Sequence, residues 1–378
     1  MPGTIRNHLG ALDASVYDDS PSEAADALSL PRAITGALDS LEGDLLLERF
    51  GEHAHRILLT ADSVLILACG GSHHLALLAK GWIESLAALP VSVELASEFR
   101  YRDSVARPRA LVVAMSRSGD LADLLGAIEH AARMGMTNSL AICDASSTEL
   151  ASACTLAFEA NTVIGNDLHF PQVFATELIV LYLLALALAR SRRTLAAQDE
   201  RNHLQTLREL PEAIDEVLAL EPRIQVWAQR LASSSDMLFL GRGMHYPVAV
   251  EGALNMKEIA SIHAEAFPAG ELKHGPLALV SANMPVVVSA PHDRLLAKLN
   301  ANLQEVSARN GKLFVFADAN CDVTADANLE VMRLGRHRGP LAPVVHTVPM
   351  RLLARHAALA RGSSLGNAPN SVWAVAAG

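Results

Sequence analysis

The amino-acid sequence predicts an α/β protein made of two tandem doubly wound parallel sheets, each flanked by helices. Short β-branched runs alternate with helical patterns along the chain. The runs are continuously apolar, as expected for strands that are buried on both faces of a parallel sheet. The pattern also repeats, because MLFLGRG from Met237 matches VLILACG from Val64, and Glu271 matches Glu98 at the same spacing. These observations indicate a duplicated α/β unit.

The 378 residues are predicted to form three parts. Residues 1–45 are expected to be an N-terminal segment, partly flexible, with a helix near 31–41. Residues 46–205 form the first domain, and 206–378 form the second domain with a C-terminal tail. The polar stretch 191–236 is expected to be a helical connector between the repeats.

Composition and charge exclude several classes of function. A net charge of −10 argues against a nucleic-acid partner. The four cysteines form no CxxC pair and are interpreted as reduced thiols of a cytoplasmic protein. The start of the chain has no apolar core of a signal peptide. The apolar run 173–189 approaches the length of a membrane span but carries Glu177, which favours a buried helix.

A Gly-rich turn follows the first strand of the first repeat, predicted over 64–68. Gly71 and Ser72 lie where this turn enters a helix. Backbone N–H groups and a hydroxyl at a helix N-terminus can bind an anion. A tight turn with an N-cap is an equally good interpretation of this turn alone.

A second polar turn follows the strand predicted over 110–115. It contains Ser116, Arg117 and Ser118, and two hydroxyls with a guanidinium suit a phosphate group. The alternative is helix capping by Ser118 beside a solvated arginine. Because a hydroxyl turn also follows a neighbouring strand, phosphate binding is the favoured interpretation.

The second repeat carries carboxylates and a histidine in place of this hydroxyl set. Glu251 and Glu258 are seven residues apart, about two helical turns, so both can face one side of a helix. His274 lies in a loop between Gly-rich and Pro-containing turns, where an imidazole can change protonation near neutral pH. From spacing alone, a solvated face for Glu258 and a packing role for His274 are favoured.

Several of these segments together resemble the sugar isomerase (SIS) family. They are VLILACGGS, SRSGDLADLL, LFLGRG and the long block from Glu251 to Leu279. The long block is similar to the isomerase region of the glutamine–fructose-6-phosphate aminotransferases, also called glucosamine-6-phosphate synthases. The resemblance covers roughly residues 25–365. It implies two tandem SIS domains, a homodimer and binding of a hexose 6-phosphate.

The resemblance also implies roles for individual residues. Ser72, Ser116 and Ser118 match positions that hold the phosphate. Glu258 matches the family's general base, which moves a proton between C1 and C2 of the sugar. His274 matches the histidine that opens the sugar ring and that the family contributes across the dimer interface.

The sequence departs from the family pattern at several of these sites. Arg117 stands where the family has glutamine, Leu121 replaces a threonine of the phosphate loop, and the loop 166–171 is longer. Asn255 replaces a lysine of the active-site helix, and Trp373 stands at the position of the tail lysine that forms a Schiff base. The family's glutaminase domain has no counterpart in these residues. Ordinary glutamine-dependent synthesis is therefore disfavoured.

The expected function is that of a sugar-phosphate isomerase or amino-sugar-phosphate deaminase. It would act on a hexose or hexosamine 6-phosphate by ring opening and C1–C2 proton transfer, without its own glutaminase. We expect a cytoplasmic homodimer with no cofactor, metal, nucleic acid or membrane partner. The alternatives are a non-catalytic sugar-phosphate sensor or paralogue, and a synthase subunit that receives ammonia from a separate glutaminase.

Overall fold

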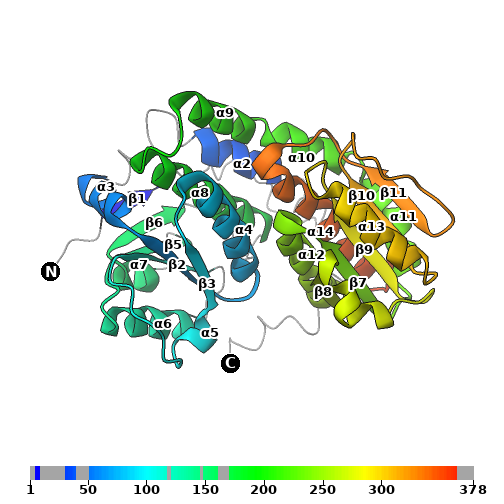
Figure 1. Cartoon of the computed structure of the whole chain (residues 1–378), viewed down its shortest axis with the longest axis horizontal. Coiled ribbons are helices and arrows are strands. Elements are labelled where there is room, and N and C mark those ends of the chain that lie inside the picture. Colours follow the sequence, from blue (N-terminus) through cyan, green and yellow to red (C-terminus); the bar gives the residue numbers. More distant parts are fainter. Residues whose placement is uncertain are drawn as a thin grey trace. The chain divides into compact units, whose positions relative to one another are not determined.

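The computed structural model divides the chain into two compact units, Met1–Pro211 and Glu212–Gly378 (Figure 1). It describes residues 5–8, 30–39, 51–116, 121–144, 148–160 and 170–363. The predicted site residues Arg117, Ser118 and Trp373 lie outside the described residues.

The first unit contains a six-stranded parallel sheet in the order β1-β6-β5-β4-β2-β3. Its strands are β1 (Ile5–His8), β2 (Ser63–Ala68), β3 (Val91–Leu95), β4 (Ala110–Met115), β5 (Ser139–Asp144) and β6 (Leu156–Ala160). The strands predicted over 64–68, 110–115 and 139–143 are confirmed as β2, β4 and β5. Strand β1, which pairs with β6, was not predicted.

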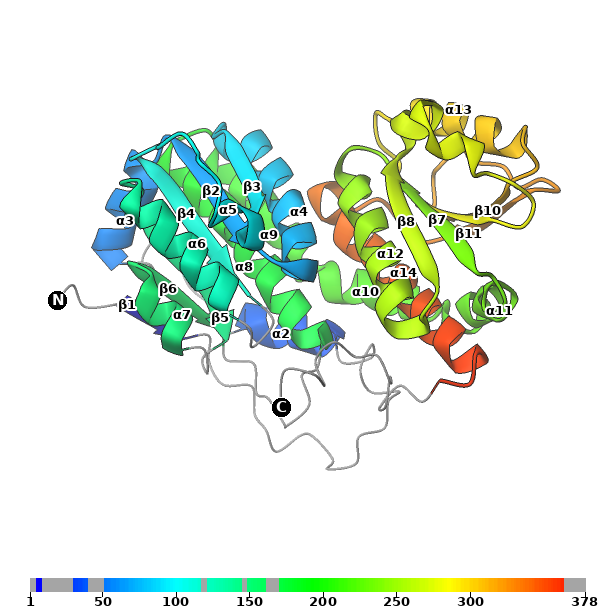
Figure 2. The ribbon, with the colours of Figure 1, turned by 90° about the horizontal axis from the view of Figure 1, so that it is seen from below.

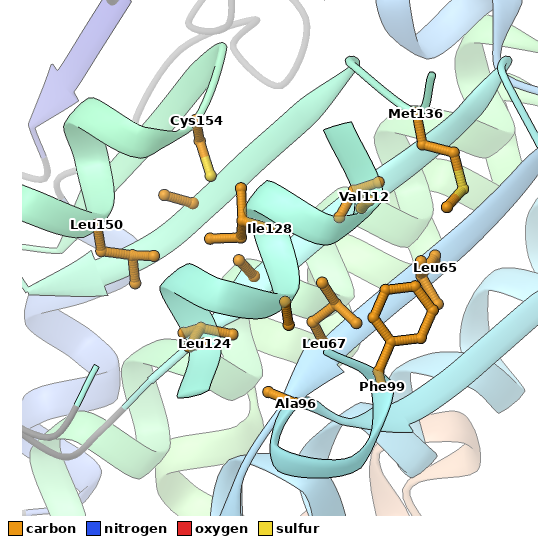
Figure 3. Packing of buried hydrophobic residues seen from close by; sticks show 14 of the residues in the cluster. Leu65, Leu67, Ala96, Phe99, Val112, Leu124, Ile128, Met136, Leu150 and Cys154 are labelled. Atoms are coloured by element: carbon orange, nitrogen blue, oxygen red, sulfur yellow. The ribbon is translucent and has the colours of Figure 1, made fainter. Parts of the chain in front are cut away.

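Helices cover both faces of this sheet, as the continuous apolar strands require. The described helices of this unit are α2 (Leu30–Asp39), α3 (Gly51–Thr60), α4 (Gly70–Ala87), α5 (Ala96–Phe99), α6 (Ala122–Arg133), α7 (Thr148–Ala153), α8 (Phe170–Ser191) and α9 (Ala197–Arg208). Helices α5, α6 and α7 lie on one face, and α4 and α8 lie on the other (Figure 2). Figure 3 shows Leu124 and Ile128 of α6 among Leu67 and Val112 of the sheet. Each such aliphatic side chain contributes roughly 1.5–3 kcal/mol by burial.

Helix α8 contains the apolar run 173–189, for which the sequence analysis weighed a membrane span against a buried helix. Its residues from Glu177 to Ala189 are all buried within the protein. Among the helices that the structure describes, none combines the length and the continuous apolar character that a bilayer span requires. The preferred interpretation of a buried helix is confirmed.

The second unit contains a five-stranded parallel sheet in the order β11-β10-β9-β7-β8. Its strands are β7 (Asp236–Gly241), β8 (His263–Pro268), β9 (Pro285–Ala290), β10 (Lys312–Ala317) and β11 (Leu329–Arg333). Its α-helices are α10 (Leu210–Leu218), α11 (Glu221–Leu231), α12 (Tyr246–Ala260), α13 (Leu296–Ser307) and α14 (Ala342–Ala360), and short 3₁₀ turns include η2 (Gly243–His245) and η3 (Ala269–His274). This strand order reproduces β6-β5-β4-β2-β3, so the predicted duplication is confirmed.

The core of the second unit also lies on both faces of its sheet. Helix α13 and η3 cover one face, and α11, α12 and α14 cover the other. On the second face, Trp227 of α11 packs against Phe314 and Phe316 of β10, with ring centroids 5.3 and 5.1 Å apart. Edge-to-face contacts of this kind favour a fixed packing of the helix on the sheet.

The strand order reverses between β2 and β4 in the first unit, and between β7 and β9 in the second. In open parallel sheets such a reversal leaves a crevice at the carboxyl ends of the two central strands, where ligands bind. The pairing of Ala68 with Met115 brings β2 and β4 to this edge in register. The fold therefore positions the two polar turns predicted from the sequence.

Candidate functional site

The first side of the candidate site is the N-terminus of α4, which follows β2 directly. Cys69, the N-cap residue, has extended backbone angles (φ −126°, ψ 155°), and its side chain makes no capping hydrogen bond. Gly70 has φ +51°, a left-handed conformation that glycine adopts at little cost. Gly71 and Ser72 are buried in the first helical turn. Because the N-cap side chain does not cap this turn, its backbone N–H groups are a suitable environment for an anion.

The second side of the site begins where β4 ends. Ser116 follows Met115 and is half-buried. Since neighbouring strands lie about 4.8 Å apart, the turns after β2 and β4 start side by side. The structure thus brings Ser116 and the α4 turn to one edge of one sheet. Arg117 and Ser118 would continue this turn but lie outside the described residues.

Ser72 has a partner that the sequence analysis missed. Its hydroxyl donates to the carboxylate of Glu177 on α8, at 3.1 Å from Oε1 and 3.3 Å from Oε2. Both side chains are buried, with exposed fractions of 1% for Ser72 and 4% for Glu177. The signal in the sequence was the single carboxylate within the apolar run 173–189. A lone acid in a buried helix requires a hydrogen-bonding partner.

His73 belongs to the same helical turn and is half-buried. Burial lowers the pKa of His73, and the neighbouring His74 lowers it further, while Glu94 opposes the shift. The His73 imidazole is therefore more readily neutral than a solvated histidine, which leaves it able to accept a proton or a hydrogen bond.

The remaining predicted residues lie in the second unit. Glu258 is exposed in the last turn of α12, and His274 is exposed at the end of η3. Asn255 is buried on α12, and its Oδ1 lies 3.5 Å from Nη1 of Arg351 on α14.

The second unit does not bring Glu258 and His274 together. Helix α12 starts at the carboxyl edge of the sheet, after β7, and returns to the amino edge, where β8 begins. Glu258, near the end of α12, therefore lies toward the amino edge. His274 lies beyond the carboxyl end of β8, at the opposite edge. A sugar bound at Glu258 is thus out of reach of the His274 of the same unit.

The carboxyl edge of the second sheet holds a chain of buried hydrogen bonds, which the sequence analysis also missed. Asp318 accepts from His337 Nδ1 at 2.6 Å and from His346 Nε2 at 2.9 Å. The other nitrogen of His346 lies 2.9 Å from Ser289 Oγ, which lies 2.7 Å from Nδ1 of His245. All but His337 are buried. Within the described residues no three His, Cys, Asp or Glu side chains converge as metal ligands.

These contacts shift the protonation equilibria of two members of the cluster. Burial alone would raise the pKa of Asp318, but hydrogen bonds from His337 and His346 outweigh burial and hold that pKa far below its usual range. Burial and the nearby His346 lower the pKa of His245 well below 6.5, and Asp318 opposes this only in part. These shifts favour an ionised carboxylate at Asp318 and a neutral imidazole at His245.

The stability of the protein is expected to fall as pH decreases below 6.5. The pKa of His245 is depressed in the folded state, so the unfolded chain takes up a proton between 6.5 and that lower value. The stability contributed by neutral His245 is complete above pH 6.5 and is lost as pH falls through the folded pKa. Urea unfolding at about pH 7.5 and about pH 5.5 measures the change.

A His245→Gln variant serves to isolate this contribution, because glutamine does not titrate. Its free energy of unfolding should change less with pH over the same interval than that of the unaltered protein. His55→Gln, on the exposed face of α3, is the matched control. An unchanged pH slope in His245→Gln would show that the dependence arises elsewhere.

The sequence and the fold match known proteins. The family model for the SIS domain matches residues 57–192 and 230–361. The glutamine–fructose-6-phosphate aminotransferases of Bordetella parapertussis and Neisseria meningitidis serogroup A are 47% identical over 372 residues and 48% identical over 346 residues. These matches cover 98% and 91% of this chain but only 60% and 56% of the relatives, so the chain spans about three fifths of their length.

A solved structure agrees over nearly its whole length. It is the C-terminal domain of glucosamine-fructose-6-phosphate aminotransferase from Francisella tularensis, with a TM-score of 0.85 and 35% identity. The match covers 90% of this chain and 97% of that chain. Together with the two matched SIS regions and the duplicated sheets, this similarity shows that the chain belongs to the SIS domain family.

Proposed function

We propose that this chain is a sugar-phosphate isomerase or amino-sugar-phosphate deaminase that acts on a hexose or hexosamine 6-phosphate. The observation that carries the proposal is the meeting of two polar turns at the reversal point of the first sheet. The α4 turn offers N–H groups, and the turn after β4 begins with the Ser116 hydroxyl. Donors of both kinds suit the oxygens of a phosphate monoester.

The chemistry of the proposal needs a carboxylate base and a second acid–base group. Glu258 takes the proton from C2 of the open-chain aldose, and the resulting enediol receives a proton at C1 to give the ketose. His274 exchanges a proton with the ring oxygen when the sugar ring opens. The similarity to the aminotransferase isomerase domain supports these roles for both residues.

We also propose that the active chain is a homodimer. Glu258 and His274 lie toward opposite edges of the second sheet, so one copy cannot apply both to a single sugar. A site that takes Glu258 from one copy and His274 from another satisfies both constraints. Variants mixed in one solution test this, because Glu258→Gln and His274→Asn chains would restore activity to each other only by sharing sites.

The second candidate function is a non-catalytic sugar-phosphate sensor. The position of Asn255 favours it, since this residue is buried against Arg351 and cannot supply an ammonium group to a substrate. Such a sensor would bind the sugar phosphate and return it unchanged. A measurement of turnover separates it from the first candidate.

Ser116→Ala is expected to weaken binding of fructose 6-phosphate roughly tenfold, because a hydrogen bond to the phosphate dianion is lost. Isothermal titration of the full chain with fructose 6-phosphate, with fructose as the sugar lacking phosphate, measures the effect. Ser85→Ala, toward the other end of α4, is the matched control. Equal affinities for Ser116→Ala and the control would remove this turn from the proposed phosphate site.

A further inference from the structure

We propose that Glu177 sets the phosphate affinity of the α4 anion site by withdrawing the Ser72 hydroxyl proton from it. This inference rests on the proposed function, since it assigns a specificity-determining residue to the same sugar-phosphate site. It starts from the contact between the two side chains, in which one hydroxyl faces both carboxylate oxygens at 3.1 and 3.3 Å.

A serine hydroxyl has one proton, so it can donate only one hydrogen bond at a time. In this contact Ser72 is the donor, so its only proton is directed at Glu177. While its proton is directed at Glu177, the Ser72 hydroxyl oxygen presents only lone pairs to a ligand. A phosphate dianion also offers only lone pairs, so Ser72 cannot stabilise it while the bond to Glu177 stands.

Burial strengthens this competition. Ser72 on α4 and Glu177 on α8 meet where these two helices pack side by side (Figure 1), and both side chains are buried. In such an environment a hydrogen bond to a charged group is stronger than in water, and water is a poor substitute partner. Rotation of Ser72 toward a phosphate would therefore leave a carboxylate oxygen without this donor.

Electrostatic repulsion between Glu177 and a bound anion is the competing explanation for an effect of this residue. The Glu177 carboxylate lies one hydrogen bond from the first turn of α4, whose N–H groups form the anion site. Repulsion between like charges does not depend on whether residue 72 carries a hydroxyl. The Ser72 contact and the charge repulsion make different predictions for variants, so they can be separated.

Glutamine is the informative replacement at position 177, because it has nearly the same shape. Its amide group can donate to Ser72 Oγ, which frees the Ser72 proton for a ligand. Glu177→Gln is therefore expected to bind inorganic phosphate and fructose 6-phosphate about tenfold more tightly. In a Ser72→Ala background the same substitution should give no gain, because no hydroxyl is left to release.

The experiment is isothermal titration of four full-length chains with inorganic phosphate and with fructose 6-phosphate. The chains are the unaltered protein, Glu177→Gln, Ser72→Ala and the double variant, each checked by its thermal unfolding. Glu129→Gln, exposed on α6, removes the same charge from the same unit as a control. A gain in Glu177→Gln that disappears in the double variant supports the proposal.

Three outcomes overturn it. Equal affinity of Glu177→Gln and the unaltered protein shows that Glu177 does not limit binding, and leaves the proposed function standing. A gain that persists in the double variant assigns the effect to charge alone and not to Ser72. Failure of every chain to bind either ligand removes the anion site itself, and the proposed function with it.

Discussion

Glu258→Gln is expected to slow exchange of the sugar hydrogens at C1 and C2 with solvent by roughly 10²–10⁴-fold. A carboxamide has the shape of the carboxylate but cannot take up the proton that moves between the two carbons. Glu258 is exposed in the last turn of α12, so the change leaves the buried face of this helix intact. Proton NMR in heavy water measures the rate, at C1 of fructose 6-phosphate and at C2 of glucosamine 6-phosphate.

The control for this variant is Glu265→Gln, an exposed glutamate on β8 of the same unit. Both substitutions remove one negative charge, so a general electrostatic effect would appear in both. Exchange at the unaltered rate in Glu258→Gln would assign the base to a different residue. Loss of exchange in both variants would point to an indirect effect on the unit.

Asp318→Asn is expected to lower the free energy of unfolding by about 1–3 kcal/mol, because a buried hydrogen-bond acceptor is lost and its donors are left unsatisfied. The carboxylate accepts from His346 on one oxygen, and from His337 and the backbone N–H of His292 on the other. Asparagine replaces one of the two carboxylate oxygens with an NH₂ group. This group is a donor, so it cannot accept the hydrogen bond that the oxygen accepted. Urea unfolding near neutral pH measures the loss.

Asp322→Asn is the matched control, since Asp322 is exposed four residues farther along the chain. It should change the stability by less than about 0.5 kcal/mol. A loss in Asp318→Asn no greater than in this control would mean that the buried cluster contributes little to folding. A further comparison is Ser289→Ala, which breaks the chain of hydrogen bonds between His346 and His245.

The architecture could be predicted from the sequence because its signals are local. Continuous apolar runs marked β2, β4 and β5, and the repeat of the whole pattern identified the second sheet. Strand β1 was not predicted because IRNH is short and polar. It becomes a strand through its pairing with β6. Tertiary context decides such segments.

The candidate site could be predicted only in part. The proximity of the turns at Ser72 and Ser116 could be predicted, because the carboxyl ends of neighbouring parallel strands meet at one edge of the sheet. The hydrogen bond between Ser72 and Glu177 could not be predicted, because Glu177 lies 105 residues away on a different helix. The separation of Glu258 from His274 likewise depends on the direction of α12 relative to its sheet.

The buried cluster of the second unit was hidden for a similar reason. Asp318, Ser289, His346 and His245 come from four separate elements, and no spacing in the sequence relates them. The available signals were single polar residues inside apolar segments, such as Ser289 in PVVVSA. Each signal says that a partner is needed without saying which residue supplies it.

We propose that this chain moves a proton between C1 and C2 of a hexose 6-phosphate. The most direct test is to incubate the unaltered full chain with fructose 6-phosphate or glucosamine 6-phosphate in heavy water and to follow the C1 and C2 signals by NMR. We predict that deuterium enters C1 of fructose 6-phosphate and C2 of glucosamine 6-phosphate, and that it does not enter C1 of fructose. Saturable binding of the sugar phosphates without any deuterium incorporation would contradict the claim and favour the sensor.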